Sequence, residues 1–368
     1  SVQSLLNTEI GIRLSNDMAL GETDFELMGM SGNNVKILLD GIPLIDRGAT
    51  KQSLSQLDVN SIERVEIVEG PMSVVYGTDA LAGVINIITK KGDGYSEENT
   101  WRVGARVQEE SMGKEYDFFK DKGLHNESID LGFNHKSGLF VNGGYTRNNH
   151  GGWQGDLTGR EKRWHPKDQA LMNGMFGFHM NVWYRLDFLD EKIFGPNNGS
   201  ELQPEKVSDK DFLTKRYTHQ LQSDWKLDNR LDVHAALSYQ DYKRRTRTTE
   251  SDLSTGEKWL SSAEASQDIT QYKAWIARAT VAWNIAPEFS VQPGVEYQWT
   301  QGEGGRIDGT PKVSDLAFFL SAEYKPWEWL SLRPGVRTFI VADYDAPIAI
   351  PSVLTNFKLS KNMDLRLS

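Results

Sequence analysis

The residue types that support catalysis or bind metals are few in this chain, and they are scattered. The seven histidines form no HExxH pattern and no close metal-binding spacing. They are His125, His135, His150, His165, His179, His219 and His234. The chain has no GxSxG pattern, no phosphate-binding glycine loop and no cysteine, which excludes disulfides and thiolate metal sites. We therefore expect neither an enzyme nor a resident metal or other intrinsic cofactor.

One segment has the chemistry of a ligand-binding loop. Residues 148–167 read NNHGGWQGDLTGREKRWHPK and combine basic with aromatic side chains. This mixture suits an anionic aromatic ligand, which ion pairs, stacking and cation–π contacts would hold. The candidate ligand-binding residues of the segment are His150, Trp153, Arg163, Trp164 and His165. The alternative is a surface loop with no ligand of its own.

A second basic run, KRRTR at 243–247, precedes Trp259. We expect residues 244–268 to form a long loop, and we add Trp259 to the candidate ligand-binding residues. The alternative interpretation of the basic run is a solvated face, or a surface that contacts phosphorylated lipid headgroups.

Composition favours a β-rich membrane protein. The chain has 368 residues, a net charge of −10 and a pI near 5.3, a balance that argues against nucleic acid as a partner. Aromatic residues make up 10% of the chain and include 11 tryptophans, although the mean hydropathy is −0.52. No apolar run approaches the ~18–20 residues that a membrane helix needs. Strands that alternate between lipid and a polar interior produce this combination.

From residue 100 onward the sequence repeats a strand pattern. Segments of about ten residues alternate apolar and polar side chains, which gives about twelve strands and a stub. The predicted strands are 100–108, 127–136, 138–147, 169–179, 182–189, 216–227, 231–243, 270–284, 290–300, 315–325, 331–341, 348–359 and 363–368. Arginine in lipid costs roughly 2–4 kcal/mol, so Arg278 and Arg337 are predicted to face the interior, with Trp275 and Val336 on the opposite face.

The connections between these strands alternate in length. Short turns such as 180–181 and 228–229 alternate with long polar loops such as 148–167 and 244–268. This alternation is typical of an outer-membrane barrel, with short turns in the periplasm and long loops outside. Tryptophans close to the short turns predict an aromatic girdle at that membrane surface. They are Trp183, Trp225, Trp283, Trp327 and Trp329.

The N-terminal part of the chain has a different pattern. Apolar segments at 35–39, 65–68 and 84–88 are separated by turn signals. Asp40-Gly41 predicts a hairpin turn, and Pro71 must end the second segment because proline lacks the backbone N–H. These residues alone predict a small mixed α/β unit.

Three motifs in this unit resemble the plug domain of TonB-dependent outer-membrane receptors. They are DGxP at 40–43, IERVExVxGP at 62–71 and YGxDAxxGVINIITK at 76–90. The motif residues are Asp40, Gly41, Gly70, Pro71, Tyr76, Gly77 and Gly83. The resemblance covers roughly residues 2–91 and is nearest in style to receptors of Bacteroidetes. Met28 and Glu69 stand where such plugs commonly carry basic residues, which puts the usual ion pairs between plug and barrel in doubt.

The resemblance implies a mainly β fold, a 22-stranded transmembrane β-barrel with an α/β plug domain in its lumen. About twelve of these strands would lie in this chain. The plug, truncated at its N-terminus, would occupy residues 1–99, and the N-terminal part of the antiparallel barrel would occupy residues 100–368. The TonB box and the remaining barrel strands are expected outside the chain.

The resemblance also implies a function. It implies active uptake of a scarce nutrient, foremost an iron complex such as a ferric siderophore or haem, so the cargo would contain iron or cobalt. The implied partners are the TonB–ExbB–ExbD complex, outer-membrane lipid and a surface lipoprotein lid, but no nucleic acid. The plug apex would bind the ligand. Its candidate residues are Asn16, Asp17, Met18, Arg47, Lys51 and Gln52.

Two alternatives stay open at this point. A cobalamin or oligosaccharide receptor would have the same architecture. A passive porin or adhesin barrel would conduct or adhere without energy coupling. Haem is the less favoured iron complex, because residues 1–99 contain no histidine.

Overall fold

The computed structural model describes most of the chain. The described residues are 6, 11–17, 22–45, 52–69, 73–77, 80–91, 98–118, 122–179, 181–305, 307, 309–341, 348–360 and 363–367. None of the helices in these ranges is long and apolar enough to cross a membrane.

A large antiparallel sheet, which we call the wall, contains most of the described residues. It has 14 strands, and each long strand pairs with the next one along the chain. The first seven are β8 (Thr100–Glu110), β9 (Leu124–Asn134), β10 (Leu139–His150), β11 (Lys167–Phe178), β12 (Val182–Gly195), β13 (Lys206–Lys226) and β14 (Leu231–Asp252). The others are β15 (Lys258–Leu260), β16 (Ile269–Ala286), β17 (Phe289–Glu303), β18 (Lys312–Trp327), β19 (Leu330–Val341), β20 (Ala349–Ser360) and β21 (Met363–Leu367).

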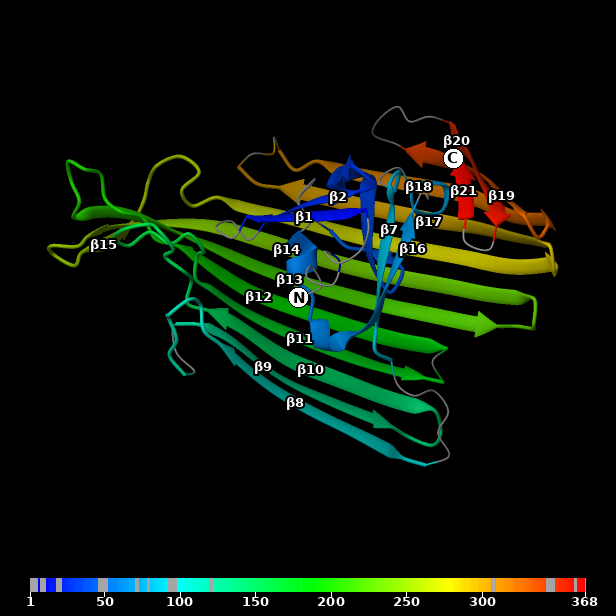
Figure 1. Ribbon diagram of the computed structural model, residues 1–368, viewed down its shortest axis with the longest axis horizontal. Helices are drawn as coiled ribbons and strands as arrows, with labels where there is room; N and C mark the ends of the chain where they lie inside the picture. Colours follow the sequence, from blue (N-terminus) through cyan, green and yellow to red (C-terminus); the bar gives the residue numbers. More distant parts are fainter. Residues whose placement is uncertain are drawn as a thin grey trace.

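The wall is curved, and its connections are sorted by length. Figure 1 shows the short turns gathered at one end of the strands, while the longer loops and β15 lie at the other end. We call these the short-turn end and the long-loop end. The sequence predicted this alternation correctly, because short polar turns alternate with long polar segments along the chain.

The hairpin β13–β14 extends further than the sequence pattern indicated. Lys206 pairs with Asp252, and the ladder runs without a break to the short turn after Lys226. The predicted loop at 244–268 is therefore wrong at its start, because the basic run at 243–247 lies inside β14. Its backbone stays paired with β13, although its side chains lack the apolar alternation of a membrane strand.

The two faces of the wall agree with the predicted alternation. Arg278 and Arg337 are 6% and 1% exposed on the concave face, whereas Trp275 is 43% exposed on the convex face. Four girdle tryptophans are exposed as predicted: Trp225, Trp283, Trp327 and Trp329. The prediction for Trp183 is wrong, because this side chain is 1% exposed and packs against Phe140 on the concave face.

The N-terminal residues form a separate small domain, the plug. A four-stranded sheet has the order β5-β4-β7-β6, and a three-stranded sheet joins β1, β2 and β3. The strands are β1 (Ile12–Asp17), β2 (Glu22–Leu27), β3 (Met30–Ser31), β4 (Val35–Leu39), β5 (Ile42–Pro43), β6 (Ile62–Glu69) and β7 (Gly83–Thr89). The helices are short: η1 (Gly32–Asn34), α2 (Gln52–Ser55), η2 (Val59–Ser61) and α3 (Ser73–Tyr76). Figure 1 shows these blue and cyan elements across the middle of the wall.

The plug motifs have clear local reasons. Asp40 and Gly41 have positive φ of 51° and 83°, which the β4–β5 hairpin turn requires. The backbone N–H and the hydroxyl of Thr89 donate to the Asp40 carboxylate at 3.0 and 2.7 Å, so this side chain joins the turn to the end of β7. Gly77, with φ of 92°, follows Tyr76 at the end of α3. Gly83 begins β7, whereas Gly70 and Pro71 lie outside the described residues.

Candidate functional site at the plug–wall interface

At its end nearest the long loops, the plug is fixed around the buried carboxylate of Glu191 on β12. The Gln56 side-chain amide donates to this carboxylate at 2.9 Å, and the Gln169 amide donates at 2.8 Å. Lys167 Nζ lies 2.8 Å from the same group. Arg216 of β13 donates to the Gln56 carbonyl at 3.0 Å. A carboxylate that is 2% exposed needs this many partners, because an unpaired buried charge is strongly destabilising.

Asp58 forms the next contact with the wall. Its carboxylate accepts from the Asn60 N–H at 3.0 Å and so caps η2. It also accepts from the Thr146 hydroxyl of β10 at 2.9 Å and from the Asn173 amide of β11 at 3.0 Å. Burial raises the pKa of the Asp58 carboxyl above its ordinary value, and the hydrogen bonds from Thr146 and Asn60 oppose that rise.

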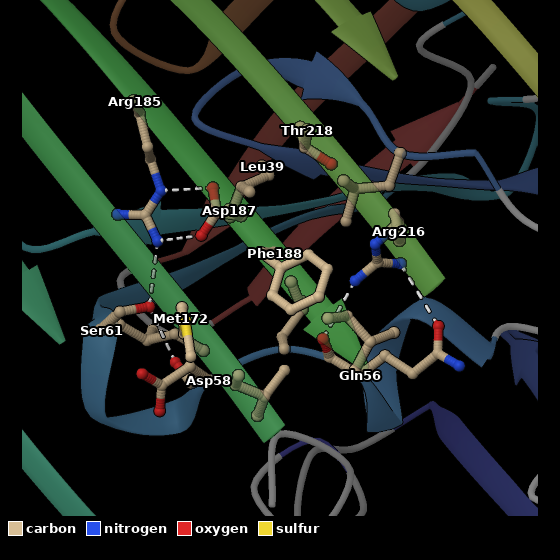
Figure 2. Close-up of a pocket in the computed structure, with 15 residues that line it drawn as sticks. Leu39, Gln56, Asp58, Ser61, Met172, Arg185, Asp187, Phe188, Arg216 and Thr218 are labelled. Carbon is tan, nitrogen blue, oxygen red and sulfur yellow. Dashed lines mark hydrogen bonds and ion pairs between the residues drawn. The ribbon is translucent and has the colours of Figure 1, made fainter. Parts of the chain in front are cut away.

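Figure 2 shows how two neighbouring wall strands present arginines to this part of the plug. Arg185 of β12 binds both oxygens of Asp187 at 2.7 and 2.6 Å, and donates to the Ser61 hydroxyl at 3.2 Å. Arg216 points to Gln56 from β13. The cavity between these groups has a volume of only about 20 Å³, room for about one water molecule. The plug is therefore closely packed on the wall here.

Three glutamines of the wall, which we call the glutamine row, hold the β4–β5 hairpin by its backbone. Gln220 and Gln222 of β13 donate to the carbonyls of Leu39 and Asp40 at 3.3 and 3.0 Å. Gln240 of β14 donates to the Pro43 carbonyl at 2.6 Å and accepts from the Ile45 N–H at 3.0 Å. All three glutamines are at most 2% exposed. Because they bind backbone groups, they recognise the path of the hairpin rather than its side chains.

A charged cluster holds α3. Glu296 lies on β17. Arg278 of β16 and Arg337 of β19 each lie 2.7 Å from its carboxylate. Arg337 also donates to the carbonyls of Val74 and Val75 at 3.4 Å, and the Arg278 guanidinium stacks 4.9 Å from the centre of the Tyr76 ring. The plug also contributes one positively charged side chain to this cluster, and that side chain lies on β4.

That plug cation is Lys36. Its Nζ donates to the Tyr76 carbonyl at 2.6 Å and interacts electrostatically with Glu296. The sequence raised doubt about ion pairing between plug and wall because Met28 and Glu69 replace basic residues. In the structure, Lys36 of the plug and the arginines of the wall instead provide the positive charges for ion pairing between plug and wall.

Only some of the predicted ligand-binding residues at the long-loop end lie close together. Trp153 and Trp164 pair through both backbone N–H groups, and their rings lie 5.7 Å apart, edge to face. His150 ends β10, and His165 precedes β11. Trp259 lies on β15, in a different hairpin, and donates to Glu250 at 2.9 Å.

The basic side chains of this loop already have acidic neighbours. Arg163 lies 2.6 Å from Asp156 and lowers the pKa of that carboxyl. Arg160 lies 2.7 Å from Asp209 across to β13. The loop therefore offers less unbalanced positive charge than its sequence suggested.

The structure describes the side chain of none of the six predicted plug-apex residues. Met18, Arg47 and Lys51 lie outside the described residues. Asn16 and Asp17 end β1, and Gln52 begins α2, but the structure describes only their backbone. In the described part of the chain, no group of three or more histidine, aspartate or glutamate side chains is arranged to hold a metal ion.

Sequence reasoning missed the side chains that fix the plug. Gln220, Gln222 and Gln240 sit at period-2 positions that face the concave side, as Arg185 and Glu191 do. A row of buried amides and charges at such positions was the available signal, because a polar residue on the inner face of a strand needs a partner inside.

The family of this domain follows from its sequence match. Residues 1–84 match the family model described as the TonB-dependent Receptor Plug Domain. The chain carries the plug domain of a TonB-dependent receptor. The ferrienterobactin receptor of Escherichia coli is 33% identical over 107 residues, which cover 25% of this chain and 14% of that protein.

Solved receptors share the whole fold, wall included. The ferric enterobactin receptor PfeA of Pseudomonas aeruginosa, in a mutant form, has a TM-score of 0.65 at 15% identity, over 99% of this chain and 58% of that one. The ferric yersiniabactin uptake receptor FyuA of Yersinia pestis has a TM-score of 0.61 at 13% identity, over 99% of this chain and 68% of that one. At such identities the likeness shows the fold. This receptor chain thus spans little more than half the length of PfeA. Receptors of this kind lie in the bacterial outer membrane, where the exposed convex face of the wall contacts lipid.

Proposed function

We propose that the full-length receptor takes up an iron complex, foremost a ferric siderophore, across the outer membrane. The supporting observation is the plug seated by buried, specific contacts on the concave face of the wall. A plug in that position obstructs passive flow, so transport requires the plug to move. This argues against a passive porin or adhesin, and it favours transport over an enzymatic role.

The charge around the plug end nearest the long loops supports an anionic ligand. Lys167 and Arg244 of the wall interact with the Glu191 carboxylate, and Arg216 donates to the Gln56 carbonyl beside it. Arg244 also lies 4.7 Å from the centre of the Phe212 ring. Arg216 and Arg244 are each 5% exposed, so this partly aromatic cluster would act on an anionic metal complex through its positive field rather than by direct contact. Relatives named for ferric enterobactin and ferric yersiniabactin agree with this ligand class.

We further propose that ligand binding is coupled to the opposite side of the plug. Ligand at the apex would shift the plug between conformations, and only the ligand's differential affinity for them can drive this shift. A TonB–ExbB–ExbD complex would then supply the energy for plug movement. A surface lipoprotein lid is an additional partner, proposed from the Bacteroidetes-like sequence style alone.

Tryptophan fluorescence of the purified full-length receptor tests the ligand class. The receptor is titrated with a panel of ferric siderophores, haemin and cobalamin. We expect saturable quenching with a ferric siderophore, and weaker binding by Arg216→Ala and Arg244→Ala variants. Quenching by cobalamin alone would instead indicate that the receptor takes up cobalamin. Binding to none of the panel would contradict direct capture of an iron complex.

A further inference from the structure

A buried histidine at the long-loop end of β9 has oxygen atoms beside both of its ring nitrogens. His125 is 3% exposed. Its Nδ1 lies 2.6 Å from the Glu109 carboxylate of β8, and its Nε2 lies 3.0 Å from the backbone carbonyl oxygen of Lys122. An ionised carboxylate and a carbonyl can only accept hydrogen bonds, so both nitrogens must donate. Only the imidazolium form has two N–H groups, because either neutral tautomer leaves a ring lone pair against an oxygen.

The carboxylate partner of His125 is itself enclosed. The Glu109 side chain is 12% exposed, and its Oε1 has no hydrogen-bond partner among the described residues. The Tyr116 hydroxyl donates to Oε2 at 3.3 Å, and the Tyr116 and His125 rings stack with their centres 6.4 Å apart. A negative charge in this position needs a cation beside it. If the proton moved from the ring to the carboxyl, the pair would still hold it, so the contact requires that proton in either arrangement.

The other elements around His125 bring little charge to it. Asn149 of β10 lies directly opposite and is neutral. At the next pair of positions Glu127 lies opposite Arg147, and Arg147 also has an acidic partner of its own on β11. The Lys122 side chain is exposed to solvent. The contact between His125 and its carboxylate partner therefore dominates the charge at this position.

This contact ties the loop between β8 and β9 to the wall. Glu109 and His125 belong to the two strands, whereas Tyr116 and Lys122 belong to the loop. The N–H of Asp117 donates at 3.0 Å to the same Lys122 carbonyl that faces His125. The protonated histidine therefore bonds a strand and the loop at once. We call His125, Glu109 and Tyr116 the clasp.

The β8–β9 loop lies against the hairpin at 151–166, which carries the two tryptophans predicted to bind ligand. Gly113 approaches so closely that a Cβ there would be only 3.3 Å from the Trp153 indole nitrogen. Glu115 lies 4.0 Å from Lys162 across the two loops. A movement of the β8–β9 loop would therefore change the surroundings of Trp153.

Resting on the proposed uptake function, we propose that His125 is a positioning residue for the ligand surface and makes that surface sensitive to pH. While the pair of His125 and Glu109 holds its proton, the clasp keeps the β8–β9 loop against the hairpin at 151–166. Loss of the proton releases the loop. A surface that is already held in one arrangement loses less conformational freedom on binding. The receptor should therefore bind its ligand more tightly in acidic than in alkaline medium.

Amide hydrogen exchange of the full-length receptor in lipid vesicles tests the clasp without a ligand. Protection is compared at about pH 5.5 and about pH 8.5, which span the ordinary titration of histidine near pH 6.5, after correction for the intrinsic pH dependence of exchange. His125→Gln cannot carry the charge. His135→Gln is the matched control, because His135 lies in the short turn after the same strand. The amides to follow are those of Asp117 and Gly151, which donate to carbonyls of the β8–β9 loop.

In the wild type and in His135→Gln, we expect the protection of both amides to fall at least about tenfold from the acidic to the alkaline condition. A loss of this size follows from breaking one hydrogen bond of a charged group. In His125→Gln the protection should be low at both pH values. Equal protection of the wild type at the two pH values would overturn the proposal, as would a pH response that His125→Gln retains.

Titration of the same three proteins with a ferric siderophore at the two pH values tests the effect on binding. From acid to alkali the wild type and His135→Gln should lose more affinity than His125→Gln, since any effect of pH on the siderophore itself is common to all three. An equal loss in wild type and His125→Gln would overturn the positioning role. Binding by none of the proteins would count against the uptake function, and hydrogen exchange would still decide whether the clasp responds to pH.

Discussion

At the scale of single residues, the plug–wall interface is dominated by buried charges that have several partners each. Glu296 interacts with Arg278, Arg337 and Lys36, and it is 2% exposed. Removing one member of such a cluster lowers the free energy of unfolding by more than the intact cluster contributes to it, because the remaining charges stay buried without compensation.

Glu296→Gln should therefore loosen the plug. We expect a loss of about 3–5 kcal/mol in the free energy of plug unfolding, as for other broken buried ion pairs. Urea titration of the full-length receptor in lipid vesicles measures it. Glu323→Gln is the control, because Glu323 pairs with Arg333 at the surface, and this change should cost at most about 1 kcal/mol. Equal effects of the two substitutions would show that the buried cluster has no special role.

Asp58 gives a prediction about pH. Its folded-state pKa is raised above the ordinary value of 3.8, so the folded plug holds this proton more tightly than the unfolded chain does. Stability from this group is accordingly fully present below pH 3.8 and is lost as pH rises through the folded-state pKa. Asp58→Asn cannot ionise and should remove this dependence, while its side-chain oxygen still accepts from Thr146.

The measurement for Asp58 is plug stability against urea across the acidic range. The wild type should become less stable relative to Asp58→Asn as pH increases. Parallel pH profiles for the two proteins would contradict the assigned environment of Asp58.

At the scale of elements, the β4–β5 hairpin is held on the wall by the glutamine row and by Ile42, which packs against Ala236 and Ile276. Replacing a glutamine by alanine leaves a buried backbone carbonyl without its donor, a loss of roughly 1–3 kcal/mol. Gln240→Ala should therefore speed amide hydrogen exchange at residues 39–45, and most clearly at the Ile45 N–H, which loses its acceptor. Gln108→Ala on the exposed edge strand β8 is the control and should leave exchange of the hairpin unchanged. Unaltered exchange in Gln240→Ala would mean that the hairpin is held by other contacts.

The long-loop hairpin at 151–166 tests the ligand surface predicted from sequence. If its tryptophans contact the ligand, Trp153→Ala with Trp164→Ala should weaken siderophore binding about tenfold or more, as loss of aromatic anchors does elsewhere. Trp283→Ala, on the convex face near a short turn, is the matched control. Unchanged affinity in the double variant would remove this loop from the binding site.

Strands and their inner faces were predictable, whereas the residues that fix the plug were not. Alternation in β16 identified Arg278 as inward-facing, since an arginine in lipid is costly. The register between strands decides which buried polar groups meet the plug, and a single sequence does not encode that register visibly. Trp183 was assigned to the girdle because it lies close to a short turn, although alternation along β12 places it on the same face as Arg185, where it packs inside with Phe140. The extension of β14 was missed because its outer part, beyond Tyr242, is paired yet has no apolar alternation.

At the scale of the whole molecule, the plug has two different environments. Toward the long loops it meets a tight, cationic surface around Glu191, and toward the short turns it borders an open cavity of about 640 Å³. The two sides of the plug therefore differ both in how closely they pack on the wall and in their charge.

Iron uptake by living cells shows whether the plug is a barrier that only an energised receptor can open. Cells that depend on the full-length receptor are given a radiolabelled ferric siderophore, with the inner-membrane TonB complex either intact or deleted. We expect accumulation of iron only when both the receptor and TonB are present, with surface binding of the siderophore preserved when TonB is absent. Equal accumulation with and without TonB would contradict it, because the plug would then not be the energised barrier to transport.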